Sequence, residues 1–335
     1  MKNLIFILLL CSLISCKEEV SGSYAKLEGM ALGTTFHITM DDAAGKIEER
    51  QIDSLIHIMN RSLSTYLPNS DISKINRGDT TVLIDELFKE VFHKSLKIYT
   101  ETDGAFDPTI GILVNAWGFG PLAGIREMNK EKVDSLMTYV GLDQLTLDGN
   151  RIIKKYPETF LDFNANAKGF AVDLIGRHLE AQGVVNYLVE IGGEIRARGV
   201  NDRGAPWRIA IESPNFDGSR SFQAIVALEG ASIATSGNYR KFKIDSVSGE
   251  KYAHTIDTKT GYPSKSNLLS ASVIGSIDCA DADGYATAFM AMGLEKSRKF
   301  LKSHPDLKAF LIYSDAAGEL KTFKTDNLII DTRNM

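Results

Sequence analysis

Two side chains late in the chain have the types and the spacing of a metal site. Asp283 and Thr287 stand four residues apart in residues 279–288, so they lie on one face if this segment is helical. A carboxylate and a hydroxyl can share one hard cation such as Mg²⁺, which would also take carbonyls, waters or phosphate oxygens. The acidic cluster could instead stabilise a helix N-terminus, with the threonine hydroxyl bonded back to its own backbone.

A second candidate segment, residues 162–173, reads DFNANAKGFAVD. We expect it to leave a buried strand, make a turn of small residues and enter a helix. Free backbone amides and Lys168 could then face an anion. An ordinary connection from strand to helix, capped by an asparagine and with Lys168 in solvent, accounts for the segment equally well.

His254 lies just ahead of a turn marked by Gly261 and Pro263. Histidine exchanges protons near neutral pH, so it could take the proton of an attacking hydroxyl. A surface histidine in a hairpin is the commoner outcome of such a pattern. The other five histidines show no metal-ligand spacing, so zinc is not expected.

A loop rich in glycine and aromatic residues surrounds Trp117 and could hold a flat heterocycle, although aromatic rings more often fill a core. Gly118, Gly120 and Gly124 do not form a dinucleotide-binding fingerprint, because Pro121 interrupts them and no clear strand precedes them. The sequence also contains no phosphate-binding loop of the Walker type and no nucleophile elbow.

The composition is that of a folded protein. Of the residues, 44% are hydrophobic and 24% are charged, which allows a globular core. The length of 335 residues allows one large domain or two ordinary ones. There are 38 basic and 43 acidic residues, so no nucleic-acid partner is expected.

The N-terminus predicts export. Lys2 precedes an apolar run at residues 4–10, and the segment closes with Leu-Ile-Ser-Cys at 13–16, as in bacterial lipoprotein signals. An ordinary secretory signal is the alternative. We expect a signal peptide at 1–15, lipidation of Cys16, a tether at 16–26 and one enzyme domain at 27–335. Cys279 would be the remaining thiol, so no disulfide can form within the chain.

Hydrophobic periodicity predicts an α+β fold with mixed or antiparallel sheets flanked by helices, because strands and helices do not alternate strictly. Expected helices lie near residues 47–63, 88–103, 130–140, 168–182, 282–292 and 294–303. Expected strands lie near residues 34–40, 160–163, 187–191, 207–212, 222–228, 269–274, 309–313 and 328–330.

Taken in order, the motifs resemble the ApbE family, the FAD:protein FMN transferases, over nearly the whole mature chain. The segments that carry the resemblance are residues 29–35 (GMALGTT), 64–66 (STY), 70–76 (SDISKIN), 103–108 (DGAFDP), 167–173 (AKGFAVD), 191–194 (IGGE), 254–257 (HTID) and 282–288 (ADGYATA).

The resemblance implies an exported, often lipid-anchored enzyme with an ApbE-like fold. Such enzymes split FAD at its pyrophosphate, move FMN onto a threonine or serine hydroxyl of a target protein and release AMP. The implied partners are FAD, flavin-carrying subunits of membrane redox complexes, and the membrane itself. The implied location is the periplasmic side of the bacterial cell envelope.

The resemblance also implies residue roles. Asp283, Thr287 and the backbone carbonyl of Ala165 fall on the family's metal-binding positions, which suggests Mg²⁺, and His254 falls on its proposed base. The FAD-contacting positions are Leu32, Tyr66, Ala116, Trp117, Gly118, Asp162 and Lys168.

The chain departs from the family pattern at three places. Leu32 stands where methionine is usual, Asn164 and Asn166 flank Ala165 where small or aliphatic residues are common, and Gly284-Tyr285 replaces Ala-Leu. Two other functions stay open: an FAD pyrophosphatase that uses water as the acceptor, and a flavin-binding lipoprotein without turnover.

Overall fold

The computed structural model describes residues 23–41, 47–122, 124–125, 127–215, 219, 221–238, 242–244 and 251–331. The expected signal peptide, Cys16 and most of the expected tether lie outside the described residues. Strand β1 (Tyr24–Ala31) begins within the 16–26 range expected for that tether. None of the helices in the described ranges has the length and apolar character needed to span a bilayer.

The centre of the protein is an eight-stranded sheet in the order β1-β2-β5-β6-β9-β12-β13-β14, and all its neighbouring strands are antiparallel. Its other strands are β2 (Thr34–Asp41), β5 (Tyr187–Ile191), β6 (Glu194–Arg198), β9 (Ala231–Gly237), β12 (Leu268–Gly275), β13 (Lys308–Ser314) and β14 (Leu320–Lys324). The two-stranded sheets pair β3 (Leu145–Asp148) with β4 (Arg151–Lys154), β7 (Trp207–Glu212) with β8 (Phe222–Leu228), and β10 (Phe242–Ile244) with β11 (Lys251–Ala253).

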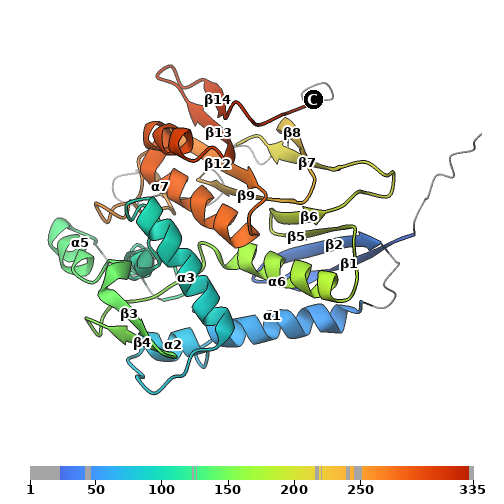
Figure 1. The fold of residues 1–335 in the computed structure, drawn as a ribbon. Coiled ribbons are helices and arrows are strands. Elements are labelled where there is room, and N and C mark those ends of the chain that lie inside the picture. The colour runs from blue at the N-terminus through green and yellow to red at the C-terminus, as the bar shows by residue number, and fades with distance from the viewer. Residues whose placement is uncertain are drawn as a thin grey trace, which may run out of the picture.

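Helices lie along one face of the sheet (Figure 1). They are α1 (Glu49–Leu63), α2 (Asp71–Asn76), α3 (Glu86–Glu101), α6 (Ala167–Ala181) and α7 (Cys279–Ser303). Two further helices, α4 (Gly111–Ala116) and α5 (Lys130–Met137), pack together in a small separate core, and short 3₁₀ helices lie at Pro108–Ile110 and Leu142–Gln144. The α+β fold class is therefore confirmed, with antiparallel pairing throughout the main sheet.

Successive side chains of each strand in the main sheet point to opposite faces, the helix side or the side of the β7–β8 hairpin. In β2, Phe36 and Ile38 are buried with residues of α1 and α6. In β6, Ile195 points to the other face and packs with Trp207 of the β7–β8 hairpin. Glu194, its neighbour in β6, therefore points to the helix side, since successive side chains of a strand alternate.

Helix α7 breaks near its middle, as expected. Gly293 has φ 77° and ψ 175°, which no α-helix accommodates, so the chain restarts a helix there. The two helices predicted at 282–292 and 294–303 are thus confirmed as the two parts of one kinked element.

Two expected strands are wrong. Residues 160–163 form no strand, because their backbone groups bond elsewhere. Asn76 Nδ2 donates to the Leu161 carbonyl and Asn76 Oδ1 accepts from Leu161 N, both at 2.8 Å. Asp162 N donates to the Pro108 carbonyl at 2.9 Å. Residues 328–330 also form no strand, and only Asp331 makes an isolated bridge, to Ile225 of β8. The apolar residues of both segments predict strands, but neither segment pairs along a neighbouring strand. The first bonds to the side chain of Asn76, and the second is followed by a single bridge at Asp331.

On the helix side, α6 and α7 approach at backbone distance. A Cβ atom added at Gly169 would lie 2.3 Å from the carbonyl oxygen of Cys279. Because that atom belongs to the backbone, a rotamer change cannot relieve the overlap.

We therefore expect Gly169→Ala to lower the free energy of unfolding by about 3 kcal/mol, since helix separation outweighs the gain of about 1 kcal/mol from better helix propensity. Urea denaturation measures the change. Gly275→Ala is the matched control: its nearest atom would lie at 3.4 Å, and we expect a change below about 1 kcal/mol. Equal stability of Gly169→Ala and wild type would contradict the close approach.

Candidate functional site

A cleft of about 850 Å³ opens between the β1–β2 turn, the loop before α6, α7 and the segment after β11. Its size lies within the range of small-molecule and cofactor sites. Seven of the residues with predicted site roles line it: Tyr66, Asp162, Ala165, Lys168, His254, Asp283 and Thr287.

The predicted metal donors meet in this cleft. Thr287 Oγ1 donates a hydrogen bond to the carbonyl oxygen of Ala165 at 3.3 Å and lies 3.3 Å from Ser236 Oγ. Asp283, one turn earlier on α7, is 2% exposed, and its Oδ2 accepts a hydrogen bond from Gly169 N at 3.1 Å. Carboxylate, hydroxyl and carbonyl oxygens are ligands that Mg²⁺ prefers.

Lys168 lies between two buried carboxylates. Its Nζ is 2.8 Å from Glu194 Oε1 and 3.9 Å from Asp283 Oδ2. Burial lowers the pKa of Lys168, but Asp283 and Glu194 outweigh burial and raise it above its usual range. Burial raises the pKa of Asp283 and of Glu194, while the ammonium opposes that rise at both. The lysine therefore stays charged.

The cleft is rich in negative charge. Its described lining includes the carboxylates of Asp107, Asp162, Glu190, Glu194, Glu212 and Asp283, and Lys168 is the one lysine or arginine among those lining residues. Burial raises the pKa of both Asp107 and Asp162 to about 6. A diphosphate would be repelled here unless a cation entered with it.

The donor set therefore fits a divalent cation. Among the described residues, no group of three or more His, Cys, Asp and Glu side chains is placed to hold a metal ion. A cation in this cleft would depend on Asp283 together with the neutral oxygens of Thr287 and Ala165. This set fits Mg²⁺ and does not fit zinc, which binds mainly thiolates and imidazoles.

Three other predicted site residues of the cleft, Asp162, His254 and Tyr66, lie on loops. Asp162 Oδ1 accepts a hydrogen bond from Asn164 N at 2.9 Å, which stabilises the turn into α6. His254 follows β11, and Thr258 Oγ1 of the same segment donates to the Gly104 carbonyl at 2.6 Å. Tyr66 follows α1 and is 62% exposed, so its ring can stack on a bound heterocycle.

The other predicted flavin contacts do not line the cleft. Trp117 Nε1 donates to the Gly261 carbonyl at 2.9 Å, and its ring lies 5.8 Å from that of Tyr262, so it joins the loop after α4 to the segment that carries His254. Ala116 is buried beside it, and Gly118 has φ 76°. Leu32 occupies the β1–β2 turn with φ 52°.

These residues support the parts of the chain that do line the cleft. Thr34 and Thr35 follow Leu32, and Phe119 and Gly120 follow Trp117.

A histidine and a glutamate that no sequence motif indicates form a pair at the cleft. His37 Nδ1 lies 2.8 Å from Glu190 Oε2, and Gly193 N donates to Glu190 Oε1 at 2.6 Å. The two residues are opposite each other in β2 and β5. They are 153 positions apart, so only the strand register could have revealed the pair.

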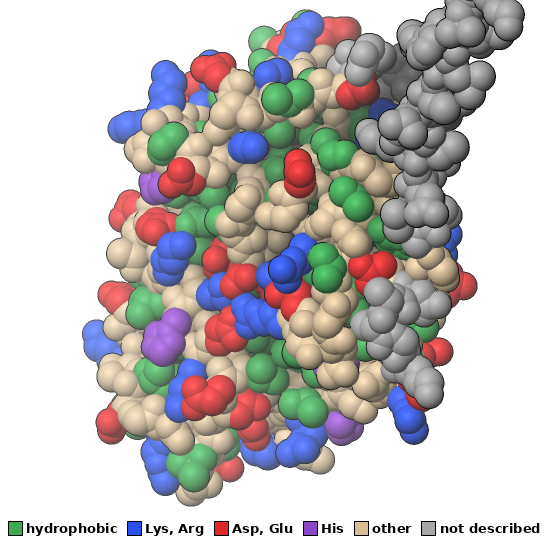
Figure 2. Space-filling view, turned by 45° about the vertical axis from the view of Figure 1, so that its right-hand side comes forward, with side chains coloured by type: hydrophobic (Ala, Val, Ile, Leu, Met, Phe, Trp, Pro, Cys, Tyr) green, Lys and Arg blue, Asp and Glu red, His purple; other side chains and the backbone are tan. Residues whose placement is uncertain are grey.

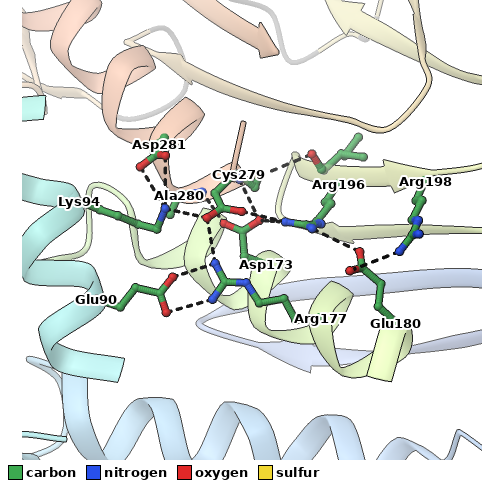
Figure 3. Close-up of polar contacts among 12 residues, drawn as sticks. Glu90, Lys94, Asp173, Arg177, Glu180, Arg196, Arg198, Cys279, Ala280 and Asp281 are labelled. Carbon is green, nitrogen blue, oxygen red and sulfur yellow. Dashed lines mark hydrogen bonds and ion pairs between the residues drawn. The ribbon is translucent and has the colours of Figure 1, made fainter. Parts of the chain in front are cut away.

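A network of ion pairs behind the cleft fixes the start of α7 (Figure 3). Asp173 of α6 accepts hydrogen bonds from the backbone N–H groups of Cys279 and Ala280, both at 2.9 Å, and pairs with Arg196 at 2.9 Å. Asp278, the N-cap residue, pairs in turn with Lys94, Arg177 and Arg196. The network thereby sets the position of Asp283, one turn along α7.

Comparison with known proteins defines the class. The chain matches the ApbE family over residues 32–311, and it belongs to that family. It is 34% identical to the FAD:protein FMN transferase of Haemophilus influenzae, with 92% of each chain covered, and 38% identical to that of Vibrio cholerae, with 83% and 84% covered.

Solved structures give the same result. The flavin transferase ApbE from Vibrio cholerae superposes with a TM-score of 0.81 at 33% identity, covering 91% of this chain and 98% of that one. The apo flavinyl transferase ApbE from Pseudomonas stutzeri gives 0.80 at 32% identity, covering 91% and 95%. The resemblance expected from the motifs is confirmed.

The network predicts a cost for Asp173→Asn. The amide keeps the shape but presents an N–H group to one of the backbone donors of α7, so we expect a loss of about 1–3 kcal/mol in the free energy of unfolding. Asp71→Asn is the control, because Asp71 makes a partly exposed ion pair with Lys74 worth less than about 1 kcal/mol. Similar denaturant midpoints for both variants would contradict the role of Asp173.

Proposed function

We propose that the protein transfers FMN from FAD to a threonine or serine hydroxyl of a target protein and releases AMP, with the help of Mg²⁺. The observation that carries the proposal is the meeting of Asp283, Thr287 and the Ala165 carbonyl beside Lys168 in one cleft. Membership of the ApbE family and the printed names of the relatives support it.

In the proposed reaction the acceptor oxygen attacks the phosphorus of the FMN half. The bond between that phosphorus and the bridging oxygen breaks, and the electron pair leaves with AMP. His254 takes the proton of the acceptor hydroxyl. Asp283, Thr287 and the Ala165 carbonyl would hold the Mg²⁺ ion, which would supply positive charge against the charge that develops on the leaving phosphate.

The other predicted residues bind and orient FAD in this proposal. Tyr66 stacks on the flavin, Asp162 and Lys168 hold the loop and the phosphates, and Leu32 supports the turn that carries Thr34. The loop of Ala116, Trp117 and Gly118 orients the flavin-bearing half, because Trp117 connects it to the His254 segment.

We also propose that the protein is a lipoprotein, anchored through Cys16 on the periplasmic side of the cell envelope. The support is the sequence of residues 1–16, together with a domain of 27–335 that needs no disulfide. Its described cysteine, Cys279, is free and buried.

The proposed acceptors are flavin-carrying subunits of membrane redox complexes. On the face shown in Figure 2, acidic and basic side chains are interspersed.

Replacement of Asp283 tests the proposal. We expect Asp283→Asn to lower the rate of FMN transfer by more than about 100-fold, because the site loses its charged ligand. Mass spectrometry of an acceptor protein incubated with FAD and Mg²⁺ measures covalent FMN. Asp281→Asn is the control, since Asp281 lies on the same helix but contacts Lys94, and we expect it to label the acceptor normally. Normal labelling by Asp283→Asn would refute the assignment.

Metal removal gives a second test. We expect EDTA to abolish acceptor labelling and added Mg²⁺ to restore it, because the described lining of the cleft holds six carboxylates and only one lysine or arginine to meet a diphosphate. The same mass spectra show whether FMN goes to the protein hydroxyl or to water. If FAD is consumed while the acceptor protein stays unmodified, water is the acceptor and the protein is a pyrophosphatase. Intact FAD after prolonged incubation with Mg²⁺ and acceptor would favour a binding protein without turnover.

A further inference from the structure

Three charged groups meet on the helix side of the cleft. Lys168 Nζ contacts Glu194 Oε1 at 2.8 Å and stands 3.9 Å from Asp283 Oδ2. Glu194 is only 1% exposed, and its second oxygen, Oε2, has no hydrogen-bond partner among the described residues. The ammonium group is therefore held by Glu194 and stays just outside hydrogen-bond distance of Asp283.

The fold places Glu194 where it can hold this lysine. The β5–β6 connection is a two-residue turn in which Gly192 and Gly193 have φ 60° and 104°, a conformation that favours glycine. Glu194 is the first residue of β6 and lies opposite Ile191, whose side chain is in the helix-side core. Its carboxylate therefore points toward the first turn of α6, where Lys168 lies.

Without that carboxylate, Lys168 would have another partner within reach. A lysine carries a compact charge on a flexible four-carbon stem, so its ammonium can turn to the nearest carboxylate. The nearest alternative is Asp283, and only about 1 Å of movement separates the present distance from a charged hydrogen bond. An ammonium bound to Asp283 would compete with a divalent cation for the same oxygens.

We propose that Glu194 is a positioning residue that holds Lys168 away from Asp283 and so keeps Asp283 available to a divalent cation. The inference rests on the proposed function, because it takes Asp283 as a metal ligand. Glu194 acts through Lys168 and does not itself bind the cation. Partners of this kind, one step removed from a metal, change metal affinity by about 10–100-fold when they are replaced.

Binding of Mn²⁺ alone, followed by electron paramagnetic resonance, measures the effect without FAD or turnover. We expect Glu194→Gln to weaken Mn²⁺ binding by about 10–100-fold, because the nearly isosteric amide keeps the packing but no longer holds the ammonium by charge. Glu190→Gln is the matched control. Glu190 lines the same cleft and contacts His37 and Gly193, so we expect its loss of charge to leave Mn²⁺ affinity within about twofold of wild type.

A crystal structure of metal-free Glu194→Gln gives the second measurement. We expect the distance from Lys168 Nζ to Asp283 Oδ2 to shorten from 3.9 Å to about 2.8 Å. Unchanged Mn²⁺ affinity would overturn the inference. Weaker affinity with an unmoved lysine would also overturn it, since the effect would then be one of charge at a distance.

Asp283→Asn separates this test from that of the proposed function. If the wild-type protein binds Mn²⁺ no better than Asp283→Asn does, the proposed metal site fails and the role of Glu194 falls with it. If wild type binds Mn²⁺ through Asp283 and Glu194→Gln binds it equally well, only the role of Glu194 fails.

Discussion

The site depends on the contact between Asp173 and the first turn of α7. A helix start leaves backbone N–H groups without partners inside the helix, and Asp173 satisfies two of them from the neighbouring helix. One carboxylate thus joins α6, which carries Lys168, to α7, which carries Asp283. Gly169 permits the two helices to approach, because any side chain there would overlap the Cys279 carbonyl.

Charge is balanced differently behind the cleft and within it. Behind it, Asp173 and Asp278 share the guanidinium of Arg196, and Lys94 adds a further cation to Asp278, so these two carboxylates are compensated within the protein. Within the cleft, Lys168 is the one lysine or arginine of the described lining, and it faces both Asp283 and Glu194. This difference suits a site that takes up a cation with its substrate, since a compensated cluster would have no electrostatic demand for one.

The sequence predicted the fold class, the main amphipathic helices and the break at Gly293, because these depend on local periodicity and on glycine geometry. It also predicted the cluster of Asp283, Thr287 and Ala165, but through family resemblance, since two side chains on one helix do not reveal a distant carbonyl. The apolar character of residues 160–163 predicts a strand, but Leu161 bonds to the side chain of Asn76, a distant partner that no local pattern reveals. The pairing of His37 with Glu190 depends on strand register, which no local pattern encodes.

The departure of Gly284-Tyr285 from the family pattern leaves the donor face of α7 intact. Residues 283 and 287 share one face, whereas residues 284 and 285 are turned away from it by the helical rotation. Tyr285 Oη donates to a carboxylate oxygen of Glu101 on α3, and a Cβ atom at Gly284 would lie 2.5 Å from Ile98 Cδ1. Gly284 leaves room for Ile98 of α3, and Tyr285 bonds to α3, so both residues fit α7 against α3. The departure from the family pattern therefore concerns helix packing and not the chemistry of the cleft.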